Sequence, residues 1–161
     1  MTDTRSPTAR AGTLLALVVS CVLVAAVTLT PAGNGWAWAD PLEELRWYLA
    51  DPLEPSVLAQ WAGNLLLLVV PAVCAVRLRP YLGRLGTATA VAVSSASAIE
   101  LAQWLVPLGR VVSPVDAALN AAGAIAAATV VRAWSGRSCP GNADSGAPDQ
   151  EAPVPALAGH R

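Results

Sequence analysis

The side chains of this sequence that could do chemistry are few, and they stand within or beside long apolar runs. Glu100 lies in an Ala-rich stretch, and Arg110 and Asp116 follow it closely. Two carboxylates near one guanidinium can bind a polar ligand, and they can shift each other's pKa values toward acid–base work. An ionisable group inside a membrane is rare and usually faces the interior of a helix bundle. Glu100 is therefore the first candidate for a functional side chain.

Polar residues also recur at helical spacing in three apolar runs. At about 100° per residue, the members of each set fall on one face of a helix. The sets are Gln60, Asn64 and Pro71; Ser97, Glu100 and Gln103; and Asp116, Asn120 and Gly123. At a rise of ~1.5 Å per residue, Asn64, Glu100 and Asn120 would lie roughly 7–11 Å below one membrane surface. Short connections join antiparallel neighbours, so we expect the three faces to converge in the outer leaflet. Pro71 is expected to kink its helix.

The candidate site is predicted to be a ligand-binding or structural polar cluster, with no catalytic residue assigned. Glu100 would be its central acceptor and Arg110 the partner cation. The members are Asn64, Ser97, Glu100, Gln103, Arg110, Asp116, Asn120 and Gly123. The alternative is that these groups only join helices, since interhelical hydrogen bonds contribute ~0.6 kcal/mol each and small residues permit close packing. That alternative accounts well for the uncharged members and poorly for the charged ones.

Several kinds of site are disfavoured by the residue types that are scarce. The single histidine is His160, in a polar C-terminal stretch, which disfavours an imidazole base or a histidine metal ligand. Cys21, Cys74 and Cys139 show no C-x-x-C spacing, which disfavours a zinc site or a disulfide framework. A formal net charge of -1 provides no basic footprint for nucleic acid. We therefore expect no metal, no cofactor and no nucleic-acid partner.

Four apolar runs must position the candidate residues. The sequence is 55% hydrophobic and 13% charged, whereas a soluble domain is about 25% charged. A helix needs roughly 20 apolar residues to cross a membrane. The runs cover residues 12–30, 57–76, 85–106 and 115–134. We expect an all-α membrane protein whose four transmembrane helices form an antiparallel bundle in a domain of residues 12–134, between a cytoplasmic segment 1–11 and a disordered cytoplasmic tail 135–161.

Arginine placement predicts the orientation of this bundle. Only Arg46 and Arg110 lie on one side of the runs, and eight arginines lie on the other. Cytoplasmic segments are enriched in Lys and Arg, so we expect a multi-pass protein of the plasma membrane with both termini in the cytoplasm. Trp61 and Trp104 at predicted outer ends and Trp134 at an inner end agree with interfacial aromatic belts.

The first run has a second interpretation, as a cleaved signal peptide. Arg5 and Arg10 precede it, and Ala37-Trp38-Ala39 resembles a signal-peptidase site. The run of 19 residues is longer than a usual signal-peptide core, which favours a retained helix. Lipidation at Cys21 is disfavoured because apolar sequence continues well beyond it.

The segment 32–56 is predicted to carry a short amphipathic helix on the outer membrane surface. Asp40-Pro41-Leu42-Glu43 combines a capping residue, a Pro at the first helical position and an acid in the first turn. Leu42, Leu45, Tyr48 and Leu49 would share one helical face. Asp51-Pro52-Leu53-Glu54 repeats the start signal before the second run. The alternative is an acidic, solvated loop.

Three blocks in this order resemble the VanZ-like membrane protein family. Asn64 to Pro71 is similar to the family's Asn, apolar run and Pro, and Ser97 to Gln103 to its Ser-x-x-Glu-x-x-Gln-like stretch. Arg110 to Gly123 is similar to its Arg followed by Asp-x-x-x-Asn-x-x-Gly. The blocks span Asn64 to about Ala127, roughly 40% of the 161 residues.

The chain also departs from the family pattern. Leu68 and Ala72 stand near the usual places of a Phe and a Gly, the acidic pair before the last helix is reduced to Asp116, and Ala127 replaces a second Gly. The resemblance implies a membrane protein without established catalysis, in a family whose named member lowers susceptibility to the glycopeptide antibiotic teicoplanin.

Three functions are compatible with these observations. The leading hypothesis is a non-enzymatic protein whose polar site engages a membrane lipid, a lipid-linked envelope precursor, a lipoglycopeptide antibiotic or a partner membrane protein. The second is a scaffold or subunit of a membrane complex or transport pathway. The third is an intramembrane enzyme that uses Glu100 or Asp116 as acid or base on a lipid, against which stands the lack of a recognisable nucleophile and base pair.

Overall fold

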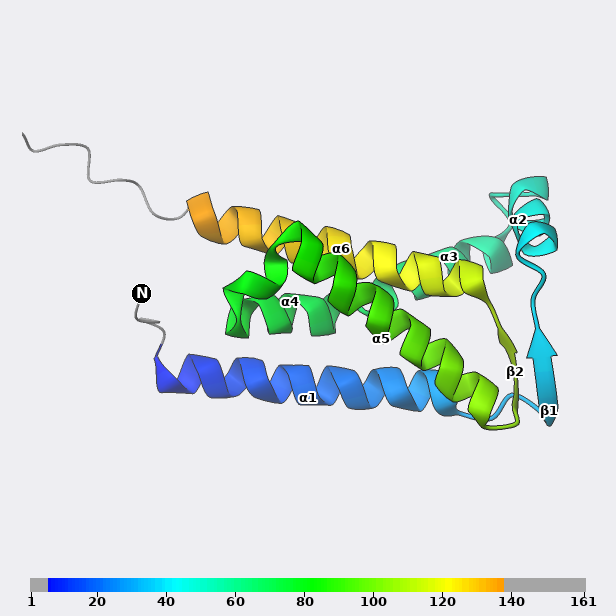
Figure 1. The fold of residues 1–161 in the computed structure, drawn as a ribbon, viewed down its shortest axis with the longest axis horizontal. Coiled ribbons are helices and arrows are strands. Elements are labelled where there is room, and N and C mark those ends of the chain that lie inside the picture. Colours follow the sequence, from blue (N-terminus) through cyan, green and yellow to red (C-terminus); the bar gives the residue numbers. More distant parts are fainter. Residues whose placement is uncertain (1–5, 138–161) are drawn as a thin grey trace, which may run out of the picture.

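Four long apolar helical stretches make up most of the protein (Figure 1). The structure is a computed structural model and describes residues 6–137. Each stretch is long and apolar enough to cross a membrane, which confirms the prediction of four long apolar helices. They are helix α1, Pro7–Leu29; helices α3, Pro55–Leu67, and α4, Val69–Leu78, which follow one another; helix α5, Leu85–Leu105; and helix α6, Pro114–Arg137. Residues 135–137 of the predicted disordered tail belong to α6, and the tail from residue 138 onward lies outside the described residues.

Helix α3 begins at a proline that follows a capping carboxylate. The Glu54 side chain accepts hydrogen bonds from the backbone N–H groups of Ser56 and Val57, at 2.8 and 3.1 Å. The Ser56 hydroxyl and these N–H groups lower the pKa of the Glu54 carboxyl, so the cap weakens as the pH falls through that lowered value. The start signal predicted at Asp51 is wrong, because the residues after it form a turn and the helix begins at Pro55.

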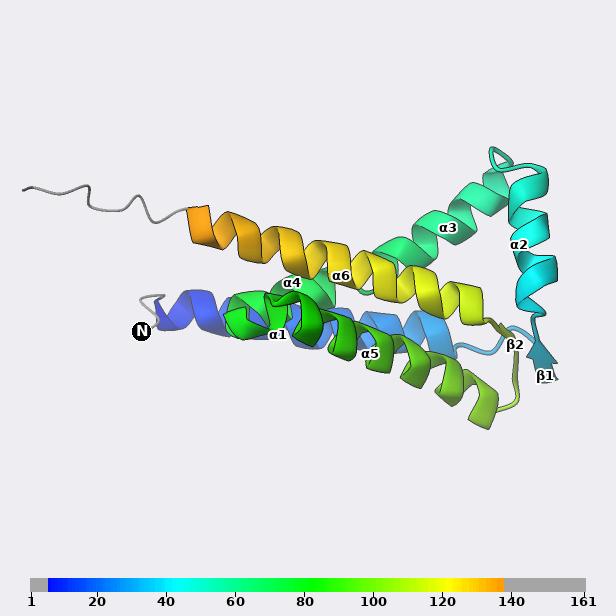
Figure 2. The same cartoon turned by 45° about the horizontal axis from the view of Figure 1, so that its top comes forward.

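Pro71 interrupts the second apolar stretch, as predicted. A proline lacks an N–H, and its ring clashes with the carbonyl four residues earlier, here that of Leu67. Leu68 accordingly departs from helical geometry, with φ -98° and ψ 2°, and separates α3 from α4. The two helices meet at an angle in Figure 2, so the predicted kink is confirmed.

Helix α6 is the centre of the bundle. It packs against α3, α4 and α5, whereas α1 packs against α4 and α5. The buried residues at the α5–α6 contact are Ala88, Ala92 and Ala96 of α5 and Ala121, Ala124 and Ala128 of α6. Such small side chains let two backbones approach closely, which is the main source of helix association in lipid.

The stretches alternate in direction along the chain. Helix α1 begins and α6 ends at the same end of the bundle, where the short 3-10 helix η1, Pro80–Gly83, joins α4 to α5 (Figure 1). The predicted antiparallel order is therefore present in the described residues. The placement of this end in the cytoplasm stays a prediction from the arginine distribution.

The expectation of an all-α fold is wrong at the other end of the bundle. Strands β1, Gly35–Trp38, and β2, Leu108–Val112, pair there in parallel, with Ala37 opposite Val111 and Trp38 opposite Val112. The strands follow α1 and α5, which end at the same end of the bundle, so both segments can run in the same direction (Figure 1). The pairing joins residues far apart in the sequence, and no local pattern predicts it.

Helix α2, Pro41–Ala50, lies across this same end (Figure 2). Asp40 caps it, as predicted, by accepting a hydrogen bond from the N–H of Leu42 at 2.8 Å. The predicted apolar face is split, however. Tyr48 is 1% exposed and points into the protein, whereas Leu42 and Leu49 are exposed. Tyr48 thus docks α2 against the rest of the protein, and Leu42 and Leu49 remain exposed.

Gly123 sets the close approach of α6 to α3. A Cβ atom built on Gly123 would collide with the backbone carbonyl of Leu65. We expect Gly123→Ala to lower the free energy of unfolding by about 1–3 kcal/mol, the usual cost of overpacking. Unfolding of the purified protein in detergent measures this. Gly86→Ala in α5 is the matched control, because a Cβ there meets no atom within 4 Å. Equal stability of the two variants would contradict the contact.

Candidate functional site

Asp116, in the first turn of α6, accepts hydrogen bonds from three neutral side chains. Asn64 of α3 donates to Oδ1 at 2.5 Å, and Gln60, one turn earlier, donates to Oδ2 at 2.8 Å. The hydroxyl of Tyr48 lies 3.1 Å from Oδ1. Two separate helices, α2 and α3, are thereby fastened to the start of α6. The predicted convergence of Asn64 and Asp116 is present in the structure.

Ser113 connects two further carboxylates to this point. Its backbone N–H donates to Oε2 of Glu100 at 2.9 Å, and its hydroxyl donates to Oε2 of Glu44 at 2.5 Å. The same hydroxyl accepts the N–H of Asp116 at 3.0 Å, which caps α6. Tyr48 also donates to Glu44, at 3.2 Å. We call Glu44, Tyr48, Glu100, Ser113 and Asp116 the carboxylate cluster.

The carboxylate cluster borders a cavity of about 470 Å³, the polar cavity. Its polar lining residues are Thr28, Glu44, Gln60, Asn64, Glu100, Gln103, Arg110, Ser113, Asp116 and Asn120. Six of the eight predicted site residues therefore share one cavity; Ser97 and Gly123 are not among its lining residues. Three carboxylates and one guanidinium face this space. Within residues 6–137, no three ligating side chains are arranged to hold a metal ion.

Arg110 does not have the role predicted for it. Its Nε donates to the carbonyl of Thr30 at 2.9 Å, and Nη2 donates to that of Val27 at 2.6 Å. In the described part of the chain it forms no ion pair with Glu100 or Asp116. The physical reason is that the last carbonyls of a helix lack partners within it and carry partial negative charge, so a cation there is stabilising.

Gln103 serves the same helix end. Its side chain is buried, and its amide donates to the carbonyl of Thr28 at 3.0 Å. Gln103 and Arg110 together satisfy three carbonyls at the C-terminus of α1, which has no basic residue in its last turn. These two predicted site residues therefore fasten α1 to the bundle, and they line the polar cavity as well.

Asn120 is among the most deeply buried side chains that line the polar cavity. It is 1% exposed, and its Oδ1 atom has no hydrogen-bond partner among the described residues. A buried acceptor without a donor is uncommon in folded proteins and calls for an explanation such as a ligand. Asn120 lies one helical turn beyond Asp116, on the same face of α6.

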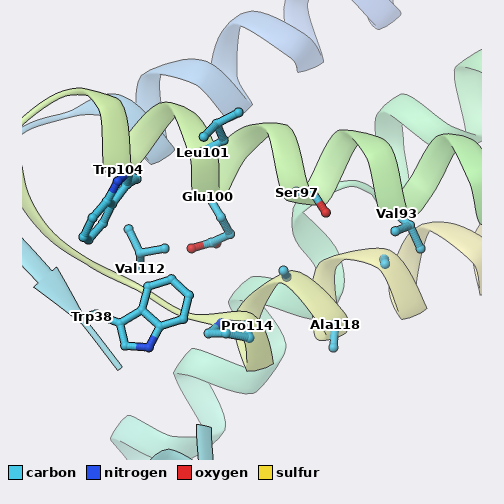
Figure 3. Close-up of a pocket in the computed structure, with 11 residues that line it drawn as sticks. Trp38, Val93, Ser97, Glu100, Leu101, Trp104, Val112, Pro114 and Ala118 are labelled. Atoms are coloured by element: carbon cyan, nitrogen blue, oxygen red, sulfur yellow. The ribbon is translucent and has the colours of Figure 1, made fainter. Parts of the chain in front are cut away.

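Glu100 also lines a second, mostly apolar space of about 590 Å³ between α5 and α6, the apolar groove (Figure 3). The residues around it are Trp38, Val93, Ser97, Glu100, Leu101, Trp104, Val112, Pro114, Ala117, Ala118 and Ala121. Trp38 of β1 meets Trp104 of α5 edge to face, with ring centroids 6.2 Å apart. Ser97 belongs to this groove. Glu100 alone among the predicted site residues borders both spaces.

Glu44, Tyr48 and Ser113 are members of the cluster that sequence reasoning missed. Ser113-Pro114-Val115-Asp116 has the form of a capping box, which does predict the start of α6. Glu44 and Tyr48 are four residues apart, and so share a face of α2. Neither pattern predicts that this face docks against α6, because the docking depends on contacts between distant segments.

Tyr48 offers a test of the cluster. Burial, with the carboxylates of Asp116 and Glu44, raises the pKa of Tyr48 far above its usual range. A phenol whose pKa is raised by folding stabilises the folded state below the unfolded pKa of about 10, and this contribution is lost as the pH rises above it. We expect Tyr48→Phe to lower the unfolding free energy by about 1–2 kcal/mol at neutral pH.

The difference between Tyr48→Phe and the unmodified protein should shrink above pH ~10, where the tyrosine loses its advantage. Unfolding in detergent across pH 7–11 measures it. Tyr81→Phe is the control, since Tyr81 is 54% exposed in η1. A constant difference between Tyr48→Phe and the unmodified protein at all pH values would contradict the buried phenol–carboxylate contact.

Arg110 can be tested by a double-mutant cycle. We expect Arg110→Gln to cost about 1–3 kcal/mol of stability, because carbonyls at the end of α1 lose a charged donor. Arg46→Gln, which removes only the exposed pair with Glu43, should cost less than about 1 kcal/mol. Arg110→Gln and Glu100→Gln should add within ~0.5 kcal/mol if the two side chains are not paired. A larger coupling energy would show that Arg110 and Glu100 interact directly, as the sequence predicts.

Comparison with known proteins identifies the family of this chain. The family model described as VanZ/LLP1 matches residues 13–135, which cover most of the first and last apolar stretches and all of the other two, with the carboxylate cluster and both spaces beside Glu100. No match is found among curated proteins or among solved structures. The chain belongs to the VanZ/LLP1 family and is a membrane protein with four candidate transmembrane helices.

Proposed function

We propose that this protein binds an amphiphilic molecule of the cell envelope and does not transform it. The candidate ligands are a membrane lipid, a lipid-linked precursor and a lipoglycopeptide antibiotic. The observation that carries the proposal is the position of Glu100, which borders the polar cavity on one side and the apolar groove on the other. A molecule with a polar part and an apolar part could occupy both spaces at once.

The surroundings of the apolar groove support an apolar occupant. The groove runs between two helices that are long enough to span a membrane, and Leu101 and Trp104 beside it are 56% and 44% exposed. In a membrane, such side chains face hydrocarbon rather than water. Pockets that bind small molecules are typically apolar with a few placed polar groups, as the groove is around Glu100.

The carboxylate cluster supports binding rather than catalysis. The hydroxyl of Ser113 is buried and already donates to Glu44, and that of Tyr48 donates to Asp116 and Glu44. Neither hydroxyl is placed beside an imidazole or an amine that could activate it, within the described residues. The carboxylates of the cluster are held as acceptors in a fixed arrangement, which is what selective binding requires.

The site lies at the end of the bundle formed by β1, α2 and β2. Arg77, Arg79, Arg84 and Arg132 belong to segments near the opposite end (Figure 1). By the positive-inside rule, we place the arginine-rich end in the cytoplasm and the site at the outer face of the plasma membrane. A site in that position would meet envelope lipids and antibiotics that arrive from outside.

Two variants test the proposal from its two sides. Glu100→Gln removes the charge at the polar cavity, and Ala118→Leu narrows the apolar groove. Ala122→Leu is the control for the second, because Ala122 is exposed on α6 and is not a lining residue of the groove. Native mass spectrometry of protein purified from its membrane would measure retained amphiphile, and growth assays would measure glycopeptide susceptibility.

We expect Glu100→Gln to lower the affinity for the retained amphiphile about tenfold, the effect of one charge-assisted hydrogen bond. Ala118→Leu should also reduce retention, and Ala122→Leu should not. Unchanged retention in both Glu100→Gln and Ala118→Leu would contradict the proposal. Turnover of lipid that requires Glu100 or Asp116 would favour the enzyme instead, and a stoichiometric co-purifying protein would favour the scaffold.

A further inference from the structure

We infer that the ligand is a phosphatidylethanolamine-class lipid, whose primary ammonium binds in the polar cavity. This inference rests on the proposed function and names the chemical class of its ligand. Its starting point is the charge of the polar cavity, where the carboxylates of Glu44, Glu100 and Asp116 outnumber the guanidinium of Arg110. The excess is two formal negative charges, so a cationic group is the complementary occupant.

The unfilled acceptor positions of the polar cavity also favour a cationic occupant. An ionised carboxylate has two oxygens and about four acceptor positions. In the described residues, the Glu100 carboxylate accepts a single hydrogen bond, from the N–H of Ser113. A group with several N–H donors would fill the remaining positions, and a primary ammonium carries three. A quaternary ammonium has the charge but no such donor.

Asn120 provides independent evidence for a donor ligand. Its side chain lines the polar cavity and is almost completely buried, and its Oδ1 atom has no donor from the described residues. A buried acceptor without a partner in the wall of a cavity is expected where an incoming N–H completes the set. An anionic group in that place would instead add repulsion to an unsatisfied acceptor.

Arg110 favours a zwitterion over a simple amine. It lines the same cavity, and its guanidinium is held in place by the carbonyls of Thr30 and Val27. A phosphate oxygen is a common partner of a guanidinium. Ethanolamine phosphate carries its cation and its anion a short distance apart, which matches a cavity with acids and one arginine.

Size selects a phospholipid among the amphiphiles. The polar cavity of about 470 Å³ holds a group the size of ethanolamine phosphate, whereas a glycopeptide or a sugar–peptide precursor has a polar part several times larger. The apolar groove runs along α5 from Trp104 past Glu100 to Val93, and it can take part of an acyl chain (Figure 3). The occupant is thus a lipid that the membrane itself supplies.

The test uses the full chain purified in detergent. Dimyristoyl phosphatidylethanolamine, phosphatidylcholine and phosphatidylglycerol are added in equal amounts, and native mass spectrometry counts the lipids retained. These lipids share their acyl chains and differ only in the headgroup. We expect phosphatidylethanolamine to be retained about tenfold over each of the others.

Two neighbouring glutamates provide a matched pair of variants. Glu44→Gln changes a member of the carboxylate cluster, and Glu43→Gln changes an exposed side chain that pairs with Arg46 on the outer face of α2. We expect Glu44→Gln to reduce the preference for phosphatidylethanolamine several-fold and Glu43→Gln to leave it unchanged. Because the comparison of lipids on the unmodified protein needs no variant, it remains decisive if Glu44→Gln fails to fold.

The outcomes separate this inference from the proposed function. Equal or stronger retention of phosphatidylcholine or phosphatidylglycerol that depends on Glu100 would overturn the inference that a primary ammonium is selected. It would leave the proposed binding of an amphiphile in place. Retention of no lipid, with no other amphiphile carried from the membrane, would overturn both. A preference for phosphatidylethanolamine that survives both Glu44→Gln and Glu100→Gln would place the lipid elsewhere and overturn the site.

Discussion

One buried residue, Ser113, holds the polar end of this protein together. Its N–H and hydroxyl reach Glu100 of α5 and Glu44 of α2, and its hydroxyl also caps α6 at Asp116. Three carboxylates of like charge would repel one another in a low-dielectric environment, where unpaired charges are costly. Neutral donors from several segments hold each of them in place, with several donors on Asp116 and Glu44 and one on Glu100. Helices α2, α5 and α6 meet at this end as a consequence, and the positions of both spaces beside Glu100 follow from it.

The C-terminus of α1 also has polar groups that need hydrogen-bond partners. A helix that ends near the middle of a polar cluster leaves carbonyls without partners, and each such group must be satisfied when water is excluded. Gln103 and Arg110 donate to these carbonyls from α5 and β2. The arginine is therefore engaged in holding α1, and the carboxylates are left with an excess of negative charge. The cavity is acidic because three carboxylates line it with one guanidinium.

Close packing of small residues joins α5 to α6 next to the apolar groove. Ala88, Ala92 and Ala96 of α5 meet the alanines of α6 along the deeper part of the contact. Toward the polar end the two helices are bordered by Trp38, Trp104 and Pro114, and the space between them extends past Glu100 to Val93 (Figure 3). An acid at the junction of an apolar groove and a polar cavity suits an amphiphile, because each part of such a molecule meets its own kind of surface.

The sequence by itself determined the four apolar helices, the start of α2 and the break at Pro71, because hydrophobic length, capping residues and a missing N–H act within a few residues of the chain. It also placed Asn64, Glu100, Asp116 and Asn120 on helical faces that can meet. Only the tertiary structure decided that β1 pairs with β2, that Tyr48 and Glu44 turn inward, and that Arg110 binds the end of α1 rather than Glu100. These outcomes depend on which distant groups come within hydrogen-bonding distance, and a side chain with several acceptable partners takes the one that the packed backbones bring to it.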